Sequence, residues 1–271
     1  MFLSLGSRLA IICGLIFITY DVNADWVSAE GRYAFSRDIT LRDCEANALL
    51  NAKLAAMSKA GLERLSSTTR DMCLEAGNQT NCELYQQTMN YFDGGFIAEI
   101  VNLEQKRTGS GSNEECVATI EADVRKYDSR SDPNFLLKAE ITGRRKMASG
   151  DVFAIEGEAS EGAHLYVFGY FPKTHGERYF RMAPNQFESS IVSKGKFSIP
   201  NKKLQKSYMF EAIFPEEVKS DEVMEYLIVL ATKKQMSMFE EETSEGFHRR
   251  LHELGRKNWQ KREIGYSIFK N

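Results

Sequence analysis

The fold of the first half of the chain is indicated by residues 116–127, which read CVATIEADVRKY. Apolar or small side chains at every second position alternate with polar ones, which is typical of a β-strand buried on one face. Residues 91–104 contain a second candidate strand, and the Gly- and Ser-containing segment 107–114 predicts a hairpin loop between the two. We therefore expect an antiparallel pair of strands, joined by a flexible loop.

A helix is expected to pack against this sheet. Residues 26–35 predict one more strand, with Gly31 as a bulge or bend. Thr40 is a suitable N-cap, and the helical pattern runs from Leu41 to Leu65, interrupted only at Gly61. One helix face carries mostly small side chains, which allows close approach to a sheet, and the nearly opposite face is also apolar. Such a helix requires a cover on both sides.

The polar residues 128–134, which include a proline, predict a linker between two domains. Residues 25–127 are expected to form a disulfide-stapled domain with a helix on an antiparallel sheet, and residues 135–271 a mostly β sandwich with a C-terminal helix and a final strand. Candidate strands, separated by Gly- and Pro-containing turns such as that at Gly162, cover residues 135–141, 152–159, 165–171, 178–182, 196–199, 208–214 and 226–232. The helix is expected within 241–258 and the final strand at 264–269. The predicted fold class is α+β.

The chain contains five cysteines, and all lie before residue 117. Cys13 belongs to the N-terminal apolar segment, and the remaining four permit three pairings: Cys44, Cys73, Cys82 and Cys116. We favour Cys73–Cys82, which closes a short loop, and Cys44–Cys116, which would tie the helix to a strand. No C-x-x-C occurs and no histidine lies between the first and the last of the four, so a zinc or thioredoxin-like redox site is disfavoured.

The N-terminal residues 1–24 predict a secretory signal peptide. Arg8 precedes the apolar run from Leu9 to Tyr20, and small residues stand at the −3 and −1 positions of a cleavage site between Ala24 and Asp25. The apolar run is shorter than the roughly 20 residues of a membrane-spanning helix. Cys13 lies inside the run and follows a large isoleucine, which disfavours lipid attachment. The expected location is therefore periplasmic or secreted, where disulfides form.

The composition excludes some function classes. Hydrophobic residues make up 42% and charged residues 27% of the chain, which are values of a globular protein. The net charge of −3 gives no basis for binding nucleic acid. No second apolar run has membrane length, so we expect a protein that is at most peripheral to a membrane.

Two polar segments near the C-terminus are candidate sites. His248 and His252 share one helix face, but the pattern H-R-R-L-H lacks the inserted glutamate of a zinc protease, and arginines flank both. We therefore interpret this face as solvated. The acidic run 240–245 precedes the helix, where its charges oppose the helix dipole, and it lacks the spacing of a calcium loop. No metal or cofactor is predicted.

Aromatic side chains are dense between residues 166 and 214. The strand at 165–171 is apolar on both faces, so it is either a central core strand, which we favour, or one of its faces is a binding platform. The platform would comprise Tyr166, Phe168 and Tyr170, and two basic residues, Arg178 and Arg181, would orient a glycan or peptide.

The second half resembles the bacterial family known as domain of unknown function 4384. The resemblance is carried by GAHLYVFGY at 162–170, RMAPN at 181–185, SIP at 198–200 and YLIVLAT at 226–232. Ala183 replaces the usual phenylalanine of the family, and His164 is unusual after the glycine. The resemblance implies a β-sandwich without established catalytic residues.

The first half is similar to the N-terminal region of flagellar assembly protein T and related envelope proteins, over about residues 25–65. The matching residues are Trp26, Ala29, Gly31, Ala46, Ala48, Ala52 and Ala55. Both resemblances imply exported or envelope-associated bacterial modules that act by binding and assembly.

The sequence thus favours a non-enzymatic periplasmic module that supports a bacterial envelope complex through contacts with an envelope protein partner. The alternative is a module that binds cell-wall glycan or peptide on the aromatic platform. An envelope hydrolase would require acids such as Glu156, Glu158 and Glu211 to converge, and the chain contains no G-x-S-x-G, P-loop or G-x-G-x-x-G motif.

Overall fold

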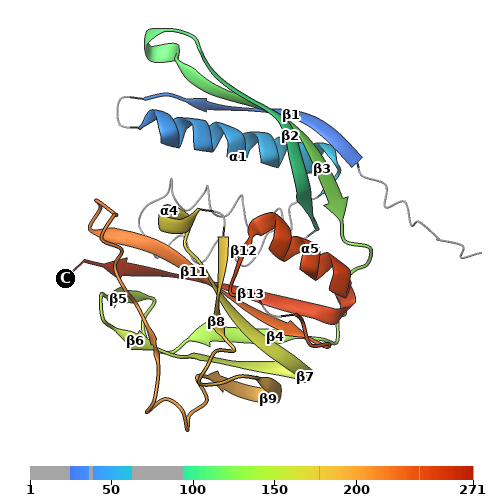
Figure 1. Ribbon diagram of the computed structural model, residues 1–271, viewed down its shortest axis with the longest axis vertical. Coiled ribbons are helices and arrows are strands. Elements are labelled where there is room, and N and C mark those ends of the chain that lie inside the picture. Colours follow the sequence, from blue (N-terminus) through green and yellow to red (C-terminus); the bar gives the residue numbers. More distant parts are fainter. Residues whose placement is uncertain (1–24, 37–38, 63–93, 177, 238, 271) are drawn as a thin grey trace, which may run out of the picture.

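The computed structural model describes residues 25–36, 39–62, 94–176, 178–237 and 239–270. The fold is α+β, and its strands form two main sheets that belong to two units of the chain (Figure 1). The predicted fold class, with a C-terminal helix followed by a final strand, is confirmed.

The first unit is a three-stranded antiparallel sheet with the order β1-β3-β2 and the helix α1 along it (Figure 1). Its elements are β1 (Asp25–Ala34), α1 (Leu41–Lys59), β2 (Gly95–Thr108), a short 3-10 turn η1 (Gly111–Asn113) and β3 (Glu115–Lys126). The strand β1 begins at the residue that follows the expected cleavage site, so cleavage there would leave the sheet intact.

The alternation of β3 decides how the helix packs. Its side chains at even positions from Cys116 to Val124 are buried together with Ala48, Ala52 and Ala56 of α1. The oxygen of Thr40 accepts a hydrogen bond from the backbone N–H of Asp43 at 3.1 Å, which confirms the predicted N-cap. The helix ends at Lys59 rather than at residue 65.

Gly31 is not the predicted bulge, because it pairs in regular register with Ala118. A Cβ atom at Gly31 would lie 2.1 Å from the backbone nitrogen of Ala52 and 2.3 Å from the carbonyl oxygen of Ala48. The glycine is therefore required by the close approach of α1, which the small residues on the helix face permit.

One of the two predicted disulfides lies within the described residues. Cys44 in α1 is bonded to Cys116 in β3, with a Cα–Cα distance of 5.8 Å, and both cysteines are buried. This confirms the prediction of a bridge between a helix and a strand. Cys73 and Cys82 lie outside the described residues.

The second unit consists mainly of one connected sheet, with the order β12-β8-β7-β11-β13-β5, to which β4 and β9 are added through β7. A two-stranded ribbon is formed by β6 and β10. The elements are β4 (Leu137–Ile141), β5 (Lys146–Ala148), β6 (Val152–Phe153), β7 (Ile155–Tyr170), α4 (Pro172–His175), β8 (Arg178–Ala183), β9 (Val192–Ile199), β10 (Phe210–Glu211), β11 (Glu222–Thr232), β12 (Glu241–Thr243), α5 (Ser244–Leu254), η2 (Arg256–Asn258) and β13 (Trp259–Phe269).

The long strand β7 takes part in this sheet along its whole length. Its first part, Ile155–Ala159, pairs with β4 and β9, and its last part, His164–Tyr170, pairs with β11 and β8. The predicted turn at Gly162 is therefore wrong, because the strand continues through this residue and shifts register with β9 between Ala159 and Ala163.

The two faces of the β7–β11–β13 region are buried against different partners. Leu165, Val167 and Leu227 belong to the inner core that the curled strands enclose. Tyr166, Phe168 and Leu230 alternate with them and lie beneath α5, together with Phe247 and Leu251 of that helix. Figure 1 shows α5 on the side of the second unit that faces β2 and β3.

Candidate functional site

The two units meet at a cluster of aromatic and imidazole rings, which we call the junction. It comprises Phe96 from β2, Tyr127 directly after β3, His248 and His252 from α5, and Trp259 at the start of β13. The first two come from the first unit and the other three from the second. A hydrogen bond between Tyr127 and His248, which are 121 positions apart in the chain, crosses this contact.

The rings of the junction are in contact. The Phe96 ring lies 5.7 Å from the His252 ring, edge to face, and 6.3 Å from the His248 ring, stacked. The Tyr127 ring meets the Trp259 ring edge to face at 5.3 Å. Such pairs contribute about 0.5–1.5 kcal/mol each beyond the burial of their area. The junction is therefore a packed contact between the two units.

The interpretation of the histidine pair as a solvated face is wrong for His248, which is 0% exposed. Its Nδ1 lies 2.9 Å from the hydroxyl oxygen of Tyr127. Burial, and in addition the positive charge of Lys261, lowers the pKa of His248 well below its ordinary value of 6.5. His248 is thus a neutral imidazole at neutral pH, held at the contact between the units.

His252 lies one turn further along α5 and is less enclosed. Its Nε2 is 3.6 Å from a carboxylate oxygen of Asp128, whose side chain is 79% exposed. This pair crosses the same contact as Tyr127 and His248. Because it is solvated, it contributes little to the free energy of the contact.

The acidic run before α5 has a structural role, as predicted. The side chain of Thr243 accepts a hydrogen bond from the N–H of Gly246, and Glu245 lies in the first turn of the helix. Glu242 accepts two hydrogen bonds from Arg250, at 3.1 and 2.9 Å, and the Arg250 guanidinium lies over the Phe239 ring. These contacts fix the start and the orientation of α5.

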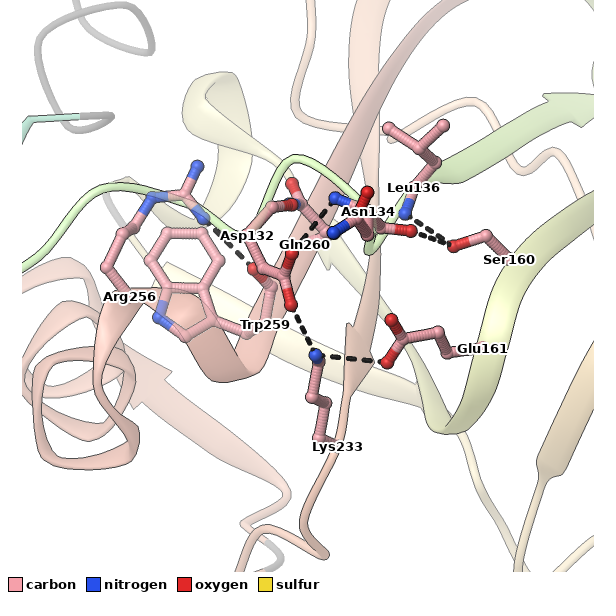
Figure 2. Close-up of polar contacts among 9 residues, drawn as sticks. All are labelled: Asp132, Asn134, Leu136, Ser160, Glu161, Lys233, Arg256, Trp259 and Gln260. Atoms are coloured by element: carbon pink, nitrogen blue, oxygen red, sulfur yellow. Dashed lines mark hydrogen bonds and ion pairs between the residues drawn. The ribbon is translucent and has the colours of Figure 1, made fainter.

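The predicted linker is anchored to the second unit by an ion-pair network, which Figure 2 shows. The ammonium of Lys233 lies 2.6 Å from Asp132 and 3.0 Å from Glu161. Gln260 donates a hydrogen bond to the carbonyl oxygen of Asp132 at 3.3 Å. The hydrogen bond from Lys233 lowers the pKa of Asp132. We call this network the linker anchor.

Next to the linker anchor, Arg256 packs on the junction. Its guanidinium lies 3.9 Å from the centre of the Trp259 ring, and it donates a hydrogen bond to the Trp259 carbonyl oxygen (Figure 2). The indole N–H of Trp259 is bonded to the carbonyl oxygen of Leu251 at 2.9 Å. Trp259 is 0% exposed. Its ring contacts Tyr127 and Arg256, and its indole N–H is bonded to Leu251.

The aromatic side chains considered as a binding platform are core residues. Tyr166, Phe168 and Tyr170 are 2%, 1% and 3% exposed. The platform alternative is wrong for this structure, because α5 covers the face of β7 on which they lie. Arg178 is exposed and forms an ion pair with Glu241, and Arg181 is half-buried. The sequence could not show that the C-terminal helix would cover these rings.

A buried acid in the second unit was missed by the sequence analysis. The carboxylate of Glu225 in β11 accepts a 2.6 Å hydrogen bond from the hydroxyl of Tyr266, its cross-strand neighbour in β13. Burial raises the pKa of Glu225. A single acid within the otherwise apolar part of a strand was the only signal available in the sequence.

The side chains considered for metal or hydrolytic chemistry are spread over the second unit. No group of three or more His, Cys, Asp or Glu side chains in the described ranges is arranged to hold a metal ion. Glu156 and Glu158 project to the same side of β7, and Glu156 pairs with Lys202 at 3.4 Å. Glu211 lies on β10, in the separate ribbon.

No protein-family model matches the chain, and no curated protein matches it. The resemblances to the two envelope families therefore stay predictions. Among the helices that the structure describes, none is long and apolar enough to cross a bilayer.

Proposed function

We propose that the protein is an exported, non-enzymatic module of a bacterial cell envelope, which supports the assembly or stability of a complex through contacts with another envelope protein. The observation that carries the proposal is the buried bridge between Cys44 and Cys116. Structural disulfides are typical of oxidising compartments. Together with the leader pattern of residues 1–24, the bridge supports maturation outside the cytosol.

The face of the first sheet opposite α1 supports a role in protein contacts. Side chains of β1 alternate between this outer face and the helix, and those at positions 26, 28, 30 and 32 are exposed. Trp26 is 50% exposed and lies opposite Asp123 of β3. Aromatic residues are enriched at the centre of protein interfaces, and charged residues at the rim. Trp26, with Ser28 and Glu30 further along the same exposed face, fits a small interface of that kind.

Site-specific crosslinking in cells tests the proposal. A photo-crosslinking amino acid at Ser28, on the outer face of β1, is expected to capture one defined envelope protein. The matched control is the same amino acid at Glu140, an exposed position of β4 in the second unit. Equal capture from both positions, or capture from neither, would contradict the proposed surface.

The compartment and the absence of catalysis are tested separately. The protein is expected in the periplasmic fraction with a mature N-terminus at Asp25, and a cytosolic protein that retains Met1 would refute export. Turnover of a cell-wall substrate that is lost in Glu156→Gln or Glu158→Gln variants would refute the non-enzymatic assignment. Retention of the protein on isolated peptidoglycan would favour the glycan-binding alternative, although its proposed aromatic rings are buried.

A further inference from the structure

We infer that the junction is an acid-operated hinge, in which protonation of His248 releases the first unit from α5 and exposes Trp259. This goes beyond the proposed function, because it assigns a conformational response to the contact between the two units. It rests on the position of His248, on the groups around it and on the chain that connects the units.

His248 stands between the two units. From the first unit, the Tyr127 hydroxyl lies 2.9 Å from its Nδ1, and the Phe96 ring stacks on it at 6.3 Å. From the second unit, the Tyr179 and Phe247 rings meet it edge to face at 6.1 and 5.5 Å. A proton on this imidazole is a charge enclosed by aromatic rings. Separation of the units opens one side of this enclosure to water, so the protonated form favours the open state.

The charged and titratable groups around His248 do not stabilise its protonated form. From β13, Lys261 opposes it, although Lys261 is itself paired with Glu263 at 2.8 Å. From α5, His252 adds positive charge when it is protonated, and Arg250 is engaged by Glu242. The uncharged hydroxyl of Tyr127 and the ring of Tyr179 also face it.

One contact acts in the opposite direction. Protonated His252 attracts Asp128, which follows Tyr127. Because the carboxylate of Asp128 is 79% exposed, water screens this attraction, and such pairs contribute about 0–1 kcal/mol. Transfer of a proton to a fully buried imidazole costs more than this. The enclosure of His248 therefore decides the direction of the response.

The chain allows the units to separate without unfolding of either one. Residues 128–131, between Tyr127 and the linker anchor, are exposed and contain no helix or strand. The anchor itself, from Asp132 to Lys233 and Glu161, belongs to the second unit. A rotation about residues 128–131 would break the ring contacts of the junction and leave both sheets and the anchor in place.

The chain contains two tryptophans, Trp26 and Trp259, which makes the test direct. In a Trp26→Phe variant, the fluorescence of Trp259 reports on the junction alone. Between about pH 7.5 and about pH 5, we expect a reversible red shift and stronger quenching by acrylamide, with a larger radius of gyration by X-ray scattering and unchanged far-ultraviolet circular dichroism. The ratio of open to closed molecules should rise up to about tenfold for each pH unit below about 6.5.

Further variants in this Trp26→Phe background identify the group that titrates. His248→Asn removes the titrating group and should abolish the transition, whereas His252→Asn, its neighbour on the same helix, should retain it. Tyr127→Phe removes only the hydrogen bond and should move the transition to higher pH, so it carries the test if His248→Asn does not fold. Unchanged Trp259 emission and radius at about pH 5 would overturn the inference. Loss of helical signal in parallel with the shift, or a full transition in a folded His248→Asn variant, would also overturn it.

Discussion

Removal of the Cys44–Cys116 bridge is expected to destabilise the first unit and to spare the second. The two cysteines are separated by 72 positions in the chain. In the loop-entropy model, a loop of this length restricts the unfolded chain by about 4 kcal/mol at 25 °C. Because the bridge joins α1 to β3, it constrains only elements of the first sheet, and the double variant Cys44→Ala/Cys116→Ala loses this restriction.

Amide hydrogen exchange measures this effect for each unit. A loss of about 4 kcal/mol corresponds to about a thousandfold faster exchange of amides that open only when the first unit unfolds. We expect this acceleration in β1, α1 and β3 of the double variant. Exchange in β11 and β13 should stay close to that of the parent protein, because these strands are buried between the inner core and α5.

The reduced parent protein is the control for the second predicted bridge. The double variant retains Cys73 and Cys82. Exchange that is faster in the reduced parent protein than in the double variant therefore reports on that pair. Equal acceleration in β1 and β11 of the double variant would refute the reasoning. It would mean that the two units unfold as one and that the junction couples them more strongly than the bridge stabilises the first.

Three further predictions test the packing. Gly31→Ala places a Cβ 2.1 Å from the α1 backbone and should cost about 1–3 kcal/mol in a thermal or denaturant melt, whereas Gly162→Ala, with no atom within 4 Å of its Cβ, should be close to neutral. Tyr266→Phe leaves Glu225 without its 2.6 Å donor and should cost about 1–3 kcal/mol of unfolding free energy, measured by urea denaturation. Because its ion pairs are partly solvated, Lys233→Met should cost only about 0.2–1 kcal/mol of the global free energy of unfolding. It should nevertheless accelerate hydrogen exchange at residues 128–136, because Lys233 holds Asp132 in the linker anchor.

The first unit was largely predictable because its determinants are local or strictly periodic. Alternation in residues 116–124 defines the buried face of β3, and Thr40 caps the helix through a side chain only three residues away. The pairing of Cys44 with Cys116 followed once the short loop was assigned to Cys73–Cys82, and this remaining pair would tie the helix to a strand. Gly31 was predicted to form a bulge or bend, whereas its lack of a side chain permits the close approach of α1. That approach is a contact between separate elements, which a local pattern does not show.

The junction was not predictable in the same way. The H-R-R-L-H pattern is strongly polar, and polar spacing on a helix normally indicates a solvated face. Phe96 and Tyr127, from a different unit, cover α5 and contribute to the burial of His248. The same helix covers Tyr166 and Phe168 on its other side, which turned an apparent platform into core. A periodic pattern identifies a face, but it does not identify the element that will cover it.

His248 and Glu225 have opposite effects on stability as the pH falls. Burial lowers the pKa of His248, so the unfolded or opened chain binds the proton more tightly, and its contribution to stability is lost as the pH falls below 6.5. Burial raises the pKa of Glu225 above its ordinary value of 4.5. Its contribution to stability is therefore present below pH 4.5 and is lost as the pH rises through the folded-state pKa. Glu225 lies opposite Tyr266 in the inner core, whereas His248 lies at the junction. Mild acid therefore weakens the contact between the units while it favours the core of the second unit, and this difference makes opening of the junction, rather than unfolding of the sheet, the expected response.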